Sequence, residues 1–259
     1  MAAAGFDWEL HELSEGLVGS RSLFSVSELY HENSKIVAAA PGIAHTPEAL
    51  AVGSTGFKRY TYVETVDLPP ARLPHALLEP VFARRSARTY GSAALQLSDV
   101  AELAYSACGF AENRHPAPSA GGLYPLELYV AAMNVEGLVP GLYHYDLRHH
   151  RLDRISAIDC RPSLNEAIFI KDAVNQAAAV FLLTGVFGRS KIKYGERAYR
   201  FVLIEAGHIM QNLLIAAQVR DLAACPVGGF VDDVLNDLLQ VDGVEEACLY
   251  AAVAGTLPD

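Results

Sequence analysis

One segment of the sequence, Glu196–Val219, restricts the fold more than any other. As a helix it would carry apolar residues on almost every side, at Val202, Leu203, Ile204, Ala206, Ile209, Met210, Leu213, Leu214 and Ala217. A helix that is apolar nearly all round must be buried on more than one side. In a chain of 259 residues, the pattern places this helix between a sheet and a partner subunit. It therefore predicts a dimer with a large apolar interface.

The other periodic segments predict a sheet flanked by helices. β-rich apolar runs predict strands at Leu126–Met133, Gly141–Tyr145, Arg151–Ile155, Ala177–Gly185 and Ala247–Ala254. Short turns join the first three, so this part of the sheet should be antiparallel. Helical patterns occur at Ser27–Ala40, at Val100–Ala107 with Ser98 as the cap and Gly109 at the end, at Ser163–Ile170 and at Val231–Leu239. The predicted class is α+β, with a mixed, largely antiparallel sheet flanked by helices.

The first 75 residues follow a less regular pattern. Phe57–Val66 is β-rich, and Leu68–Pro74 is extended because each proline moves the preceding residue out of the α region. We interpret residues 1–75 as an arm or lid rather than an independent domain, and residues 76–259 as the main domain. Met1–Leu10 contains two acidic residues and no apolar core, so it does not resemble a secretory signal.

Charge and cysteine usage exclude several classes of function. The formal net charge is −10 and 51% of the residues are hydrophobic, which argues against a protein that mainly binds nucleic acid or an anionic membrane. The four cysteines are scattered singly, so neither a disulfide framework nor a metal site is expected. These features indicate a cytoplasmic protein in which any ligand phosphate needs a local basic cluster.

Such a cluster occurs at residues 84–88. Arg84, Arg85 and Arg88 surround Ser86 within five residues. Guanidinium groups form charge-assisted and sometimes bidentate hydrogen bonds to phosphate. Taken alone, the motif is still more often a solvated surface cluster than a binding site.

Two glycine pairs mark places where a ligand could approach the backbone closely. Pro118, Ser119, Ala120 and Gly121 begin a small-residue loop that continues to Pro125, and its glycines leave room for a flat aromatic ligand. The alternative is a tight loop before a strand. Gly228–Gly229 forms a second such turn. Neither has the spacing of a dinucleotide-binding fingerprint.

The dipeptide Lys193–Tyr194 precedes the long helix. A lysine ammonium beside a tyrosine stabilises the phenolate, so the pair could donate or accept a proton. Without further context an ordinary surface position is the more common explanation for such a dipeptide.

Taken together and in this order, these motifs resemble the SagB-type dehydrogenases of the FMN-dependent nitroreductase superfamily, a group that includes azoline dehydrogenases. The matching stretches are YHENSK (Tyr30–Lys35), RRSART (Arg84–Thr89), PSAGGLYPLELYV (Pro118–Val130), VEGLVPGLYHYD (Val135–Asp146), KYGERAYRF (Lys193–Phe201), EAGHIMQNLLIAA (Glu205–Ala217) and CPVGGF (Cys225–Phe230). The resemblance covers most of the chain after Ser27.

The resemblance implies a nitroreductase-like fold with FMN at the interface of an intertwined homodimer. It assigns the FMN phosphate, ribityl chain and pyrimidine edge to the Arg84–Arg88 cluster, and the ring contacts from the partner chain to Pro118–Gly121. Gly228 and Gly229 would lie near the reactive side of the flavin, and Lys193–Tyr194 would transfer protons. Many relatives hold the phosphate with a basic residue after the last strand, which this sequence lacks, and Arg197 is the expected substitute.

The implied activity is FMN-dependent oxidation of a thiazoline or oxazoline to the aromatic azole, with O2 expected to reoxidise the flavin. The substrate would be a ribosomal peptide or a carrier-bound nonribosomal intermediate, and the expected partners are a cyclodehydratase or a peptide synthetase. One alternative is an NAD(P)H-dependent nitroreductase, which takes its electrons from the nicotinamide. Another is a flavin-containing scaffold subunit of a biosynthetic complex.

Overall fold

The computed structural model describes residues 25–37 and 74–258 of the chain. Their centre is a six-stranded sheet in the order β5-β4-β2-β6-β8-β7, in which each neighbouring pair is antiparallel. The strands are β2 (Leu126–Ala132), β4 (Gly141–Asp146), β5 (Arg151–Ser156), β6 (Ala179–Val186), β7 (Leu222–Val227) and β8 (Glu246–Thr256). A separate parallel pair joins β1 (Leu95–Gln96) to β3 (Val135–Glu136).

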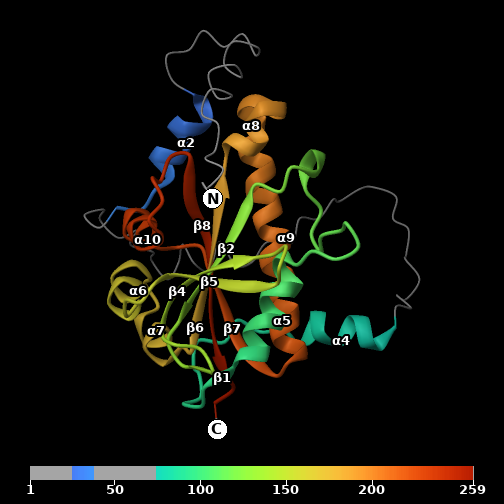
Figure 1. Ribbon diagram of the computed structural model, residues 1–259, viewed down its shortest axis with the longest axis vertical. Helices are drawn as coiled ribbons and strands as arrows, with labels where there is room; N and C mark the ends of the chain where they lie inside the picture. Colours follow the sequence, from blue (N-terminus) through green and yellow to red (C-terminus); the bar gives the residue numbers. More distant parts are fainter. Residues whose placement is uncertain (1–24, 38–73, 259) are drawn as a thin grey trace, which may run out of the picture.

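Helices cover both faces of the sheet (Figure 1). One face packs against α5 (Leu97–Cys108) and α9 (Ala198–Val219), with α4 (His75–Ala83) alongside α9. The other face packs against α6 (Arg161–Ala167), α7 (Lys171–Gln176) and α10 (Asp232–Leu239). Along β6, Phe181 and Leu183 enter the first core and Val180 and Leu182 enter the second. The α+β class with a largely antiparallel sheet is therefore confirmed.

Strand β7 was not predicted from the sequence, and its last two residues, Pro226 and Val227, were assigned to the glycine turn at Pro226–Phe230. Leu222–Val227 pairs along its whole length with β8 and lies at the edge of the sheet. Proline cannot donate a hydrogen bond to a ladder, and an edge strand tolerates it because one side has no neighbour. Pro226 thus lies within the strand, and only Gly228–Gly229 forms the turn that follows.

The predicted helix Glu196–Val219 corresponds to α9, and a separate short helix precedes it. Helix α8 (Gly188–Tyr194) ends at Gly195, whose φ of 52° and ψ of −140° suit glycine, and a 3₁₀ turn, η2 (Gly195–Arg197), leads into α9. Most apolar residues of α9 are buried, whereas Leu203 and Ile204 remain exposed. The stretch Gly188–Val219 is long and apolar enough to cross a membrane, but half of its most apolar window is buried within the fold. We therefore describe it as a core helix.

Other predicted boundaries changed by a few residues. Helix α5 begins at Leu97 and its cap is Gln96, because the Asp99 carboxylate accepts a hydrogen bond of 2.9 Å from the Gln96 amide; Ser98 lies inside the helix. Helix α2 (Val26–Ser34) is the beginning of the predicted Ser27–Ala40 helix and ends earlier. The predicted β-rich run Phe57–Val66 and the linker up to residue 73 lie outside the described residues.

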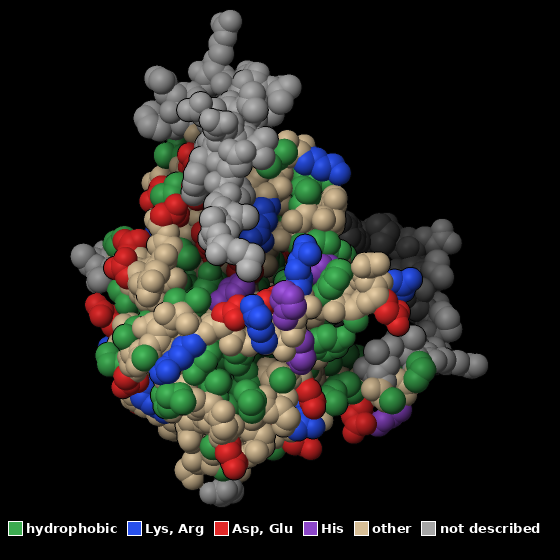
Figure 2. Space-filling view, in the orientation of Figure 1, with side chains coloured by type: hydrophobic (Ala, Val, Ile, Leu, Met, Phe, Trp, Pro, Cys, Tyr) green, Lys and Arg blue, Asp and Glu red, His purple; other side chains and the backbone are tan. Residues whose placement is uncertain are grey.

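Residues 25–37 pack against the main fold. Ile36 forms a bridge with Val231, and the Ile36 amide donates to the Asp232 carboxylate at 2.9 Å. On the face seen in Figure 2, basic, acidic and histidine side chains are interspersed with apolar ones and gather across its middle. This face is therefore not uniformly acidic.

Candidate functional site

The residues expected to bind a cofactor or act in catalysis fall into two groups. One group combines the loop at residues 118–122 with Lys193 and Tyr194 at the end of α8. The other combines Arg84–Arg88 with the Gly228–Gly229 turn, because the arginine segment runs beside β7. Each group unites motifs that are far apart in the sequence.

The first group is defined by the close approach of Gly121 to the end of α8. Gly121 lies in the 3₁₀ turn η1 (Ala120–Gly122) with a φ of 66°. A Cβ placed on it would lie 2.6 Å from the Tyr194 hydroxyl oxygen and 2.9 Å from Lys193 Nζ. Both polar atoms thus point at the same part of the loop. The left-handed backbone conformation favours glycine here, and a larger residue would displace the ends of the Tyr194 and Lys193 side chains.

The aromatic ring of Tyr194 is held by its neighbours. It makes an edge-to-face contact with Phe201 of α9 at a centroid distance of 5.0 Å, and Lys193 Nζ lies 5.4 Å from its centroid. These contacts direct the hydroxyl toward the loop at residues 118–122. A lysine–tyrosine pair beside a glycine loop can exchange a proton with a ligand that lies against that loop.

Glu205 contacts the same loop through Ser119. It was not identified as a site residue from the sequence. It lies on α9, only 3% exposed, and its carboxyl contacts the Ser119 side chain. Ser119 Oγ also accepts a hydrogen bond of 2.9 Å from the Tyr124 amide. Burial raises the pKa of Glu205 to about 7, although the Ser119 hydrogen bond acts in the opposite direction. A carboxyl within an apolar helix was the signal that could have revealed it.

The second group is anchored by Tyr90. Its hydroxyl donates to the carbonyls of Ala87 and Val253 at 2.9 and 3.1 Å, and the Ala87 amide donates to Ala224 of β7 at 3.0 Å. These bonds fix the arginine segment along the edge strand. Burial raises the pKa of the Cys225 thiol there, which fits a buried structural thiol rather than a nucleophile.

The arginines of this cluster have different surroundings. Arg88 and Arg84 both lie close enough to Cys225 to oppose the rise of its pKa. Arg85 instead donates to the carbonyls of Phe82, Ala83 and Arg84 at the end of α4, the shortest bond being 2.6 Å. Within residues 25–37 and 74–258, none of the three has a salt-bridge partner. Unpaired cations in an acidic chain suit an anionic ligand.

The Gly228–Gly229 turn leaves its backbone open. A Cβ at Gly228 would meet Tyr250 at 3.8 Å, and one at Gly229 would meet Phe169 at 3.7 Å, which are ordinary contacts. The protomer itself therefore does not require glycine at either position. The arginine cluster and this open turn together fit the phosphate and ring of FMN, so the residues present are compatible with that cofactor.

Arg197 does not join the arginine cluster within one protomer. It begins α9, with its guanidinium 5.8 Å from the Phe201 ring. A helix of 22 residues is about 33 Å long, and the cluster lies beside β7, which follows the other end of α9 (Figure 1). Arg197 and the arginine cluster could therefore contact the same ligand only if they came from two different protomers. The role of Arg197 in phosphate binding remains a prediction.

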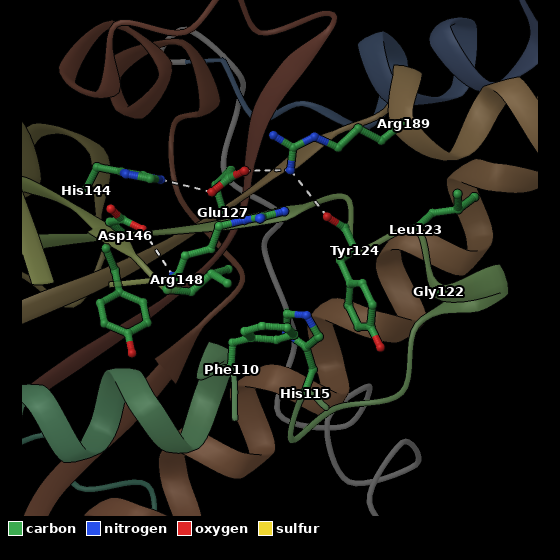
Figure 3. A pocket seen from close by; sticks show the side chains of 12 residues that line it. Phe110, His115, Gly122, Leu123, Tyr124, Glu127, His144, Asp146, Arg148 and Arg189 are labelled. Atoms are coloured by element: carbon green, nitrogen blue, oxygen red, sulfur yellow. Dashed lines mark hydrogen bonds and ion pairs between the residues drawn. The ribbon is translucent and has the colours of Figure 1, made fainter. Parts of the chain in front are cut away.

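A pocket of about 460 Å³, lined by both charged and aromatic residues, opens beside the first group (Figure 3). Glu127 of β2 lies between His144 of β4 and Arg189 of α8. Its carboxylate oxygens are 2.9 Å from His144 Nε2 and 2.5 Å from an Arg189 guanidinium nitrogen. The hydrogen bond to Glu127 raises the pKa of His144 despite partial burial. Opposite them the His115 ring stacks on Tyr124 at a centroid distance of 3.7 Å. Sequence reasoning missed this pocket, because its charged residues are spread over four separate segments.

Metal binding finds no support in the part of the chain that the structure describes. No group of three or more His, Cys, Asp or Glu residues there could hold a metal ion. The four cysteines are all buried and unpaired.

Comparison with known proteins identifies the family. The family model described as "Nitroreductase family" matches residues 81–256. The chain belongs to the nitroreductase family. A protein of Methanocaldococcus jannaschii that is named as a nitroreductase, MJ1384, is 30% identical over 181 residues, which cover 69% of this chain and 89% of that protein.

Two relatives of this nitroreductase-family chain are named for peptide processing. The trifolitoxin-processing protein TfxB of Rhizobium leguminosarum bv. trifolii is 32% identical over 54% of this chain and 39% of its own length. The microcin B17-processing protein McbC of Escherichia coli is 27% identical over 56% of each chain. The match thus spans only part of both relatives.

Solved structures agree on the fold. A chain of the E. coli microcin synthetase McbBCD complex, with truncated pro-MccB17 bound, aligns with a TM-score of 0.67 at 19% identity, over 98% of this chain and 95% of that one. A nitroreductase from Desulfovibrio desulfuricans in complex with FMN aligns at 0.51 with 20% identity, over 73% and 89%. At these identities the comparison shows the nitroreductase fold alone.

Proposed function

We propose that this nitroreductase-family protein is a SagB-type, FMN-dependent azoline dehydrogenase, which oxidises a thiazoline or oxazoline in a peptide natural product to the aromatic azole. The contact of Lys193 and Tyr194 with Gly121 carries the proposal. It sets a proton-transfer pair directly beside the loop that is expected to meet the cofactor. The names of TfxB and McbC, both peptide-processing proteins, support the choice of substrate class.

The described residues suit the binding of FMN. Arg84 and Arg88, which have no acidic partner among the described residues, are assigned to its phosphate and pyrimidine edge, with Ser86 between them. Arg85 contributes less, because the end of α4 already occupies its guanidinium. Pro118–Gly121 and Gly228–Gly229 are assigned to the ring.

Aromatisation removes a proton from one ring carbon and a hydride from its neighbour. FMN, when bound, supplies the acceptor for the hydride. The proton is assigned to the Lys193–Tyr194 pair, since the ammonium and the hydroxyl both face Gly121 of the loop. Glu205 keeps Ser119, and with it the loop, at the distance from Tyr194 that this transfer needs.

A homodimer completes the site in this proposal. Leu203 and Ile204 of α9 expose apolar surface, at 38% and 57%. Exposed apolar surface on a core helix favours burial against a second copy. The loop of one protomer would then face the arginine cluster of its partner.

The substrate is inferred to be an azoline-containing peptide, either ribosomal or carrier-bound, presented by a cyclodehydratase or a peptide synthetase in the cytoplasm. McbBCD, which has a chain of the same fold, is a synthetase complex with a peptide bound. No role with nucleic acid or at a membrane is proposed.

Anaerobic mixing tests the function. An azoline peptide alone should bleach the visible absorbance of the FMN-loaded protein and yield the azole. If NADPH bleaches the FMN absorbance and the azoline peptide does not, the protein would instead be a nitroreductase, the activity in the name of MJ1384. Variants that lose FMN but still support azole formation within an assembled complex would identify a scaffold subunit.

A further inference from the structure

The YHENSK stretch has no role in the proposed site, yet it occupies helix α2, which lies against the segment that carries Lys193 and Tyr194. That segment contains a break, since α8 ends at Tyr194 and the chain turns at Gly195 before η2 and α9. A short helix that ends at a glycine can change its direction easily. The orientation of α8 relative to α9 therefore depends on contacts from other parts of the chain.

Contacts from α2 reach both sides of this break. On the α8 side, Lys191 Nζ forms an ion pair of 2.6 Å with Glu28, and the lysine side chain is only 12% exposed. On the η2 side, Glu196 accepts hydrogen bonds from the Ser25 hydroxyl at 2.8 and 2.9 Å and from the Ser27 amide at 2.5 Å. Residues 191 and 196 flank the pair at 193 and 194.

The electrostatics of the second contact favour a charged Glu196. Its carboxylate faces the N-terminus of α2, where the helix dipole attracts negative charge. Burial would raise the pKa of Glu196, but the hydrogen bonds from Ser27 and Ser25 outweigh burial and hold it below the ordinary value. The carboxylate therefore stays ionised at neutral pH and keeps its bonds to α2.

His31 repeats this bridging arrangement deeper in the structure. Its ring makes edge-to-face contacts with Phe187, just before α8, and with Tyr199, in the first turn of α9. The Gly243 carbonyl accepts from Nε2 at 3.2 Å, so Nδ1 of the neutral ring accepts from the Tyr199 hydroxyl at 3.0 Å. Burial and the nearby Lys35 lower the pKa of His31, which favours this neutral form.

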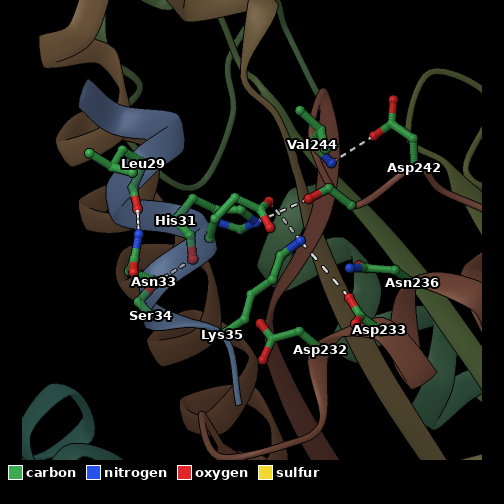
Figure 4. A network of polar contacts seen from close by, with 12 residues as sticks. Leu29, His31, Asn33, Ser34, Lys35, Asp232, Asp233, Asn236, Asp242 and Val244 are labelled. Atoms are coloured by element: carbon green, nitrogen blue, oxygen red, sulfur yellow. Dashed lines mark hydrogen bonds and ion pairs between the residues drawn. The ribbon is translucent and has the colours of Figure 1, made fainter. Parts of the chain in front are cut away.

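The far end of α2 is tied to a different element. Figure 4 shows Lys35 extending from the end of α2 toward Asp233 of α10, with Nζ 3.9 Å from the carboxylate. The Asp232 carboxylate accepts from the Ile36 amide. Helix α2 is thus attached to the fold at both ends. It can therefore hold α8 and α9 in a fixed relative orientation across the break at Gly195.

We propose that α2 positions the Lys193–Tyr194 pair by fixing the α8–α9 break from both sides, which makes Ser25, Ser27 and Glu28 positioning residues. The catalytic part of this inference rests on the proposed function. Without α2, the two side chains would still be present but would not stay aligned with Gly121.

The test uses full-length, FMN-loaded protein and the double variant Ser25→Ala/Glu28→Gln. Glu32→Gln is the matched control, because Glu32 lies on the same helix and its ion pair is with Lys35, away from the break. We expect the double variant to lower kcat about 10–100-fold with little change in KM, since misplacement of catalytic groups by about 1 Å costs such factors. The control should retain the wild-type kcat.

Charge reversal distinguishes positioning from general damage. Glu28→Lys alone should lower kcat, and Glu28→Lys/Lys191→Glu should recover most of it, because the ion pair is re-formed with opposite polarity. Failure of the second change to recover kcat would contradict a role of this pair.

Hydrogen–deuterium exchange supplies a readout independent of the reaction. Amides in residues 188–197 should exchange about tenfold faster in Ser25→Ala/Glu28→Gln than in the wild type or in Glu32→Gln. Unchanged exchange would overturn the proposal, and so would faster exchange with an unchanged kcat. If the wild type does not oxidise azolines, the proposed function fails, and exchange alone then decides whether α2 fixes the break.

Discussion

Gly121 and Tyr194 lie so close together that a methyl group on the glycine would stand 2.6 Å from the tyrosine hydroxyl oxygen. This contact joins two motifs that are widely separated in the sequence. It also supplies the context that a lysine–tyrosine dipeptide lacks by itself. Substitutions at either residue should therefore have specific effects on turnover, which can be measured.

Gly121→Ala should reduce turnover far more than it reduces stability. The new Cβ displaces the Tyr194 hydroxyl and Lys193 Nζ, so we expect kcat to fall about 100-fold. Gly122→Ala is the matched control, because Gly122 has a similar φ of 68° but a Cβ added to it would meet nothing within 4 Å. Both variants should lose about 1–2 kcal/mol of stability from left-handed strain. Equal kcat values in the two would contradict a role for the contact.

The arginines should differ in their effect on FMN affinity. Arg84→Ala or Arg88→Ala removes charge-assisted hydrogen bonds of about 1.5–3 kcal/mol, which raises the Kd for FMN about 10–150-fold. Arg85→Ala should raise it less, because Arg85 already donates to the end of α4. Fluorescence titration of the apoprotein with FMN measures all three. A wild type that binds no FMN would refute the cofactor assignment.

Glu205 should make stability depend on pH. Its folded pKa of about 7 lies above the ordinary 4.5, so its protonated form stabilises the fold fully below pH 4.5. That contribution, up to roughly 3 kcal/mol, is lost as pH rises through 7. Urea unfolding at pH 5 and pH 8 should therefore show the wild type weakening relative to Glu205→Gln. A difference between the two proteins that is the same at both pH values would contradict the assignment.

If the protein forms the proposed homodimer, Leu203→Asp and Ile204→Asp should yield a monomer with weakened FMN binding, because each introduces a charge on the apolar surface of α9. Val139→Asp is the control, since Val139 is at least as exposed as either residue but lies in the loop after β3. Analytical ultracentrifugation gives the molar mass. A flavin-loaded, monomeric wild type would show that the second copy is not needed.

The fold was largely predictable because its sheet is built from clear apolar runs. The buried strand around Phe181 and the core helix around Val202 carry strong, local patterns. The edge strand that contains Pro226 was not predicted, because Pro226, Gly228 and Gly229 together are typical of a turn. Its pairing with β8 is what makes it a strand. The core helix was predicted from Glu196 and begins at Ala198, so its start just after Gly195 was close to the observed one.

The candidate site was predictable only as separate motifs. Sequence alone could not place Tyr194 beside Gly121, because that contact depends on how α8 packs on the loop before β2. It missed Glu205 and the pocket around Glu127, whose partners come from distant elements. Charged side chains reveal such roles only when tertiary packing sets their burial and partners.

The central claim is that Lys193 and Tyr194 transfer the proton during azoline oxidation. The most direct measurement is mass-spectrometric timing of the loss of two hydrogen atoms from an azoline peptide, with FMN-loaded wild type, Lys193→Ala and Tyr194→Phe. The account predicts that the wild type forms the azole and that both variants keep FMN and the dimer but react about 10²–10⁴-fold more slowly. Wild-type rates in both variants, or an azoline left unchanged by the FMN-loaded wild type, would contradict it.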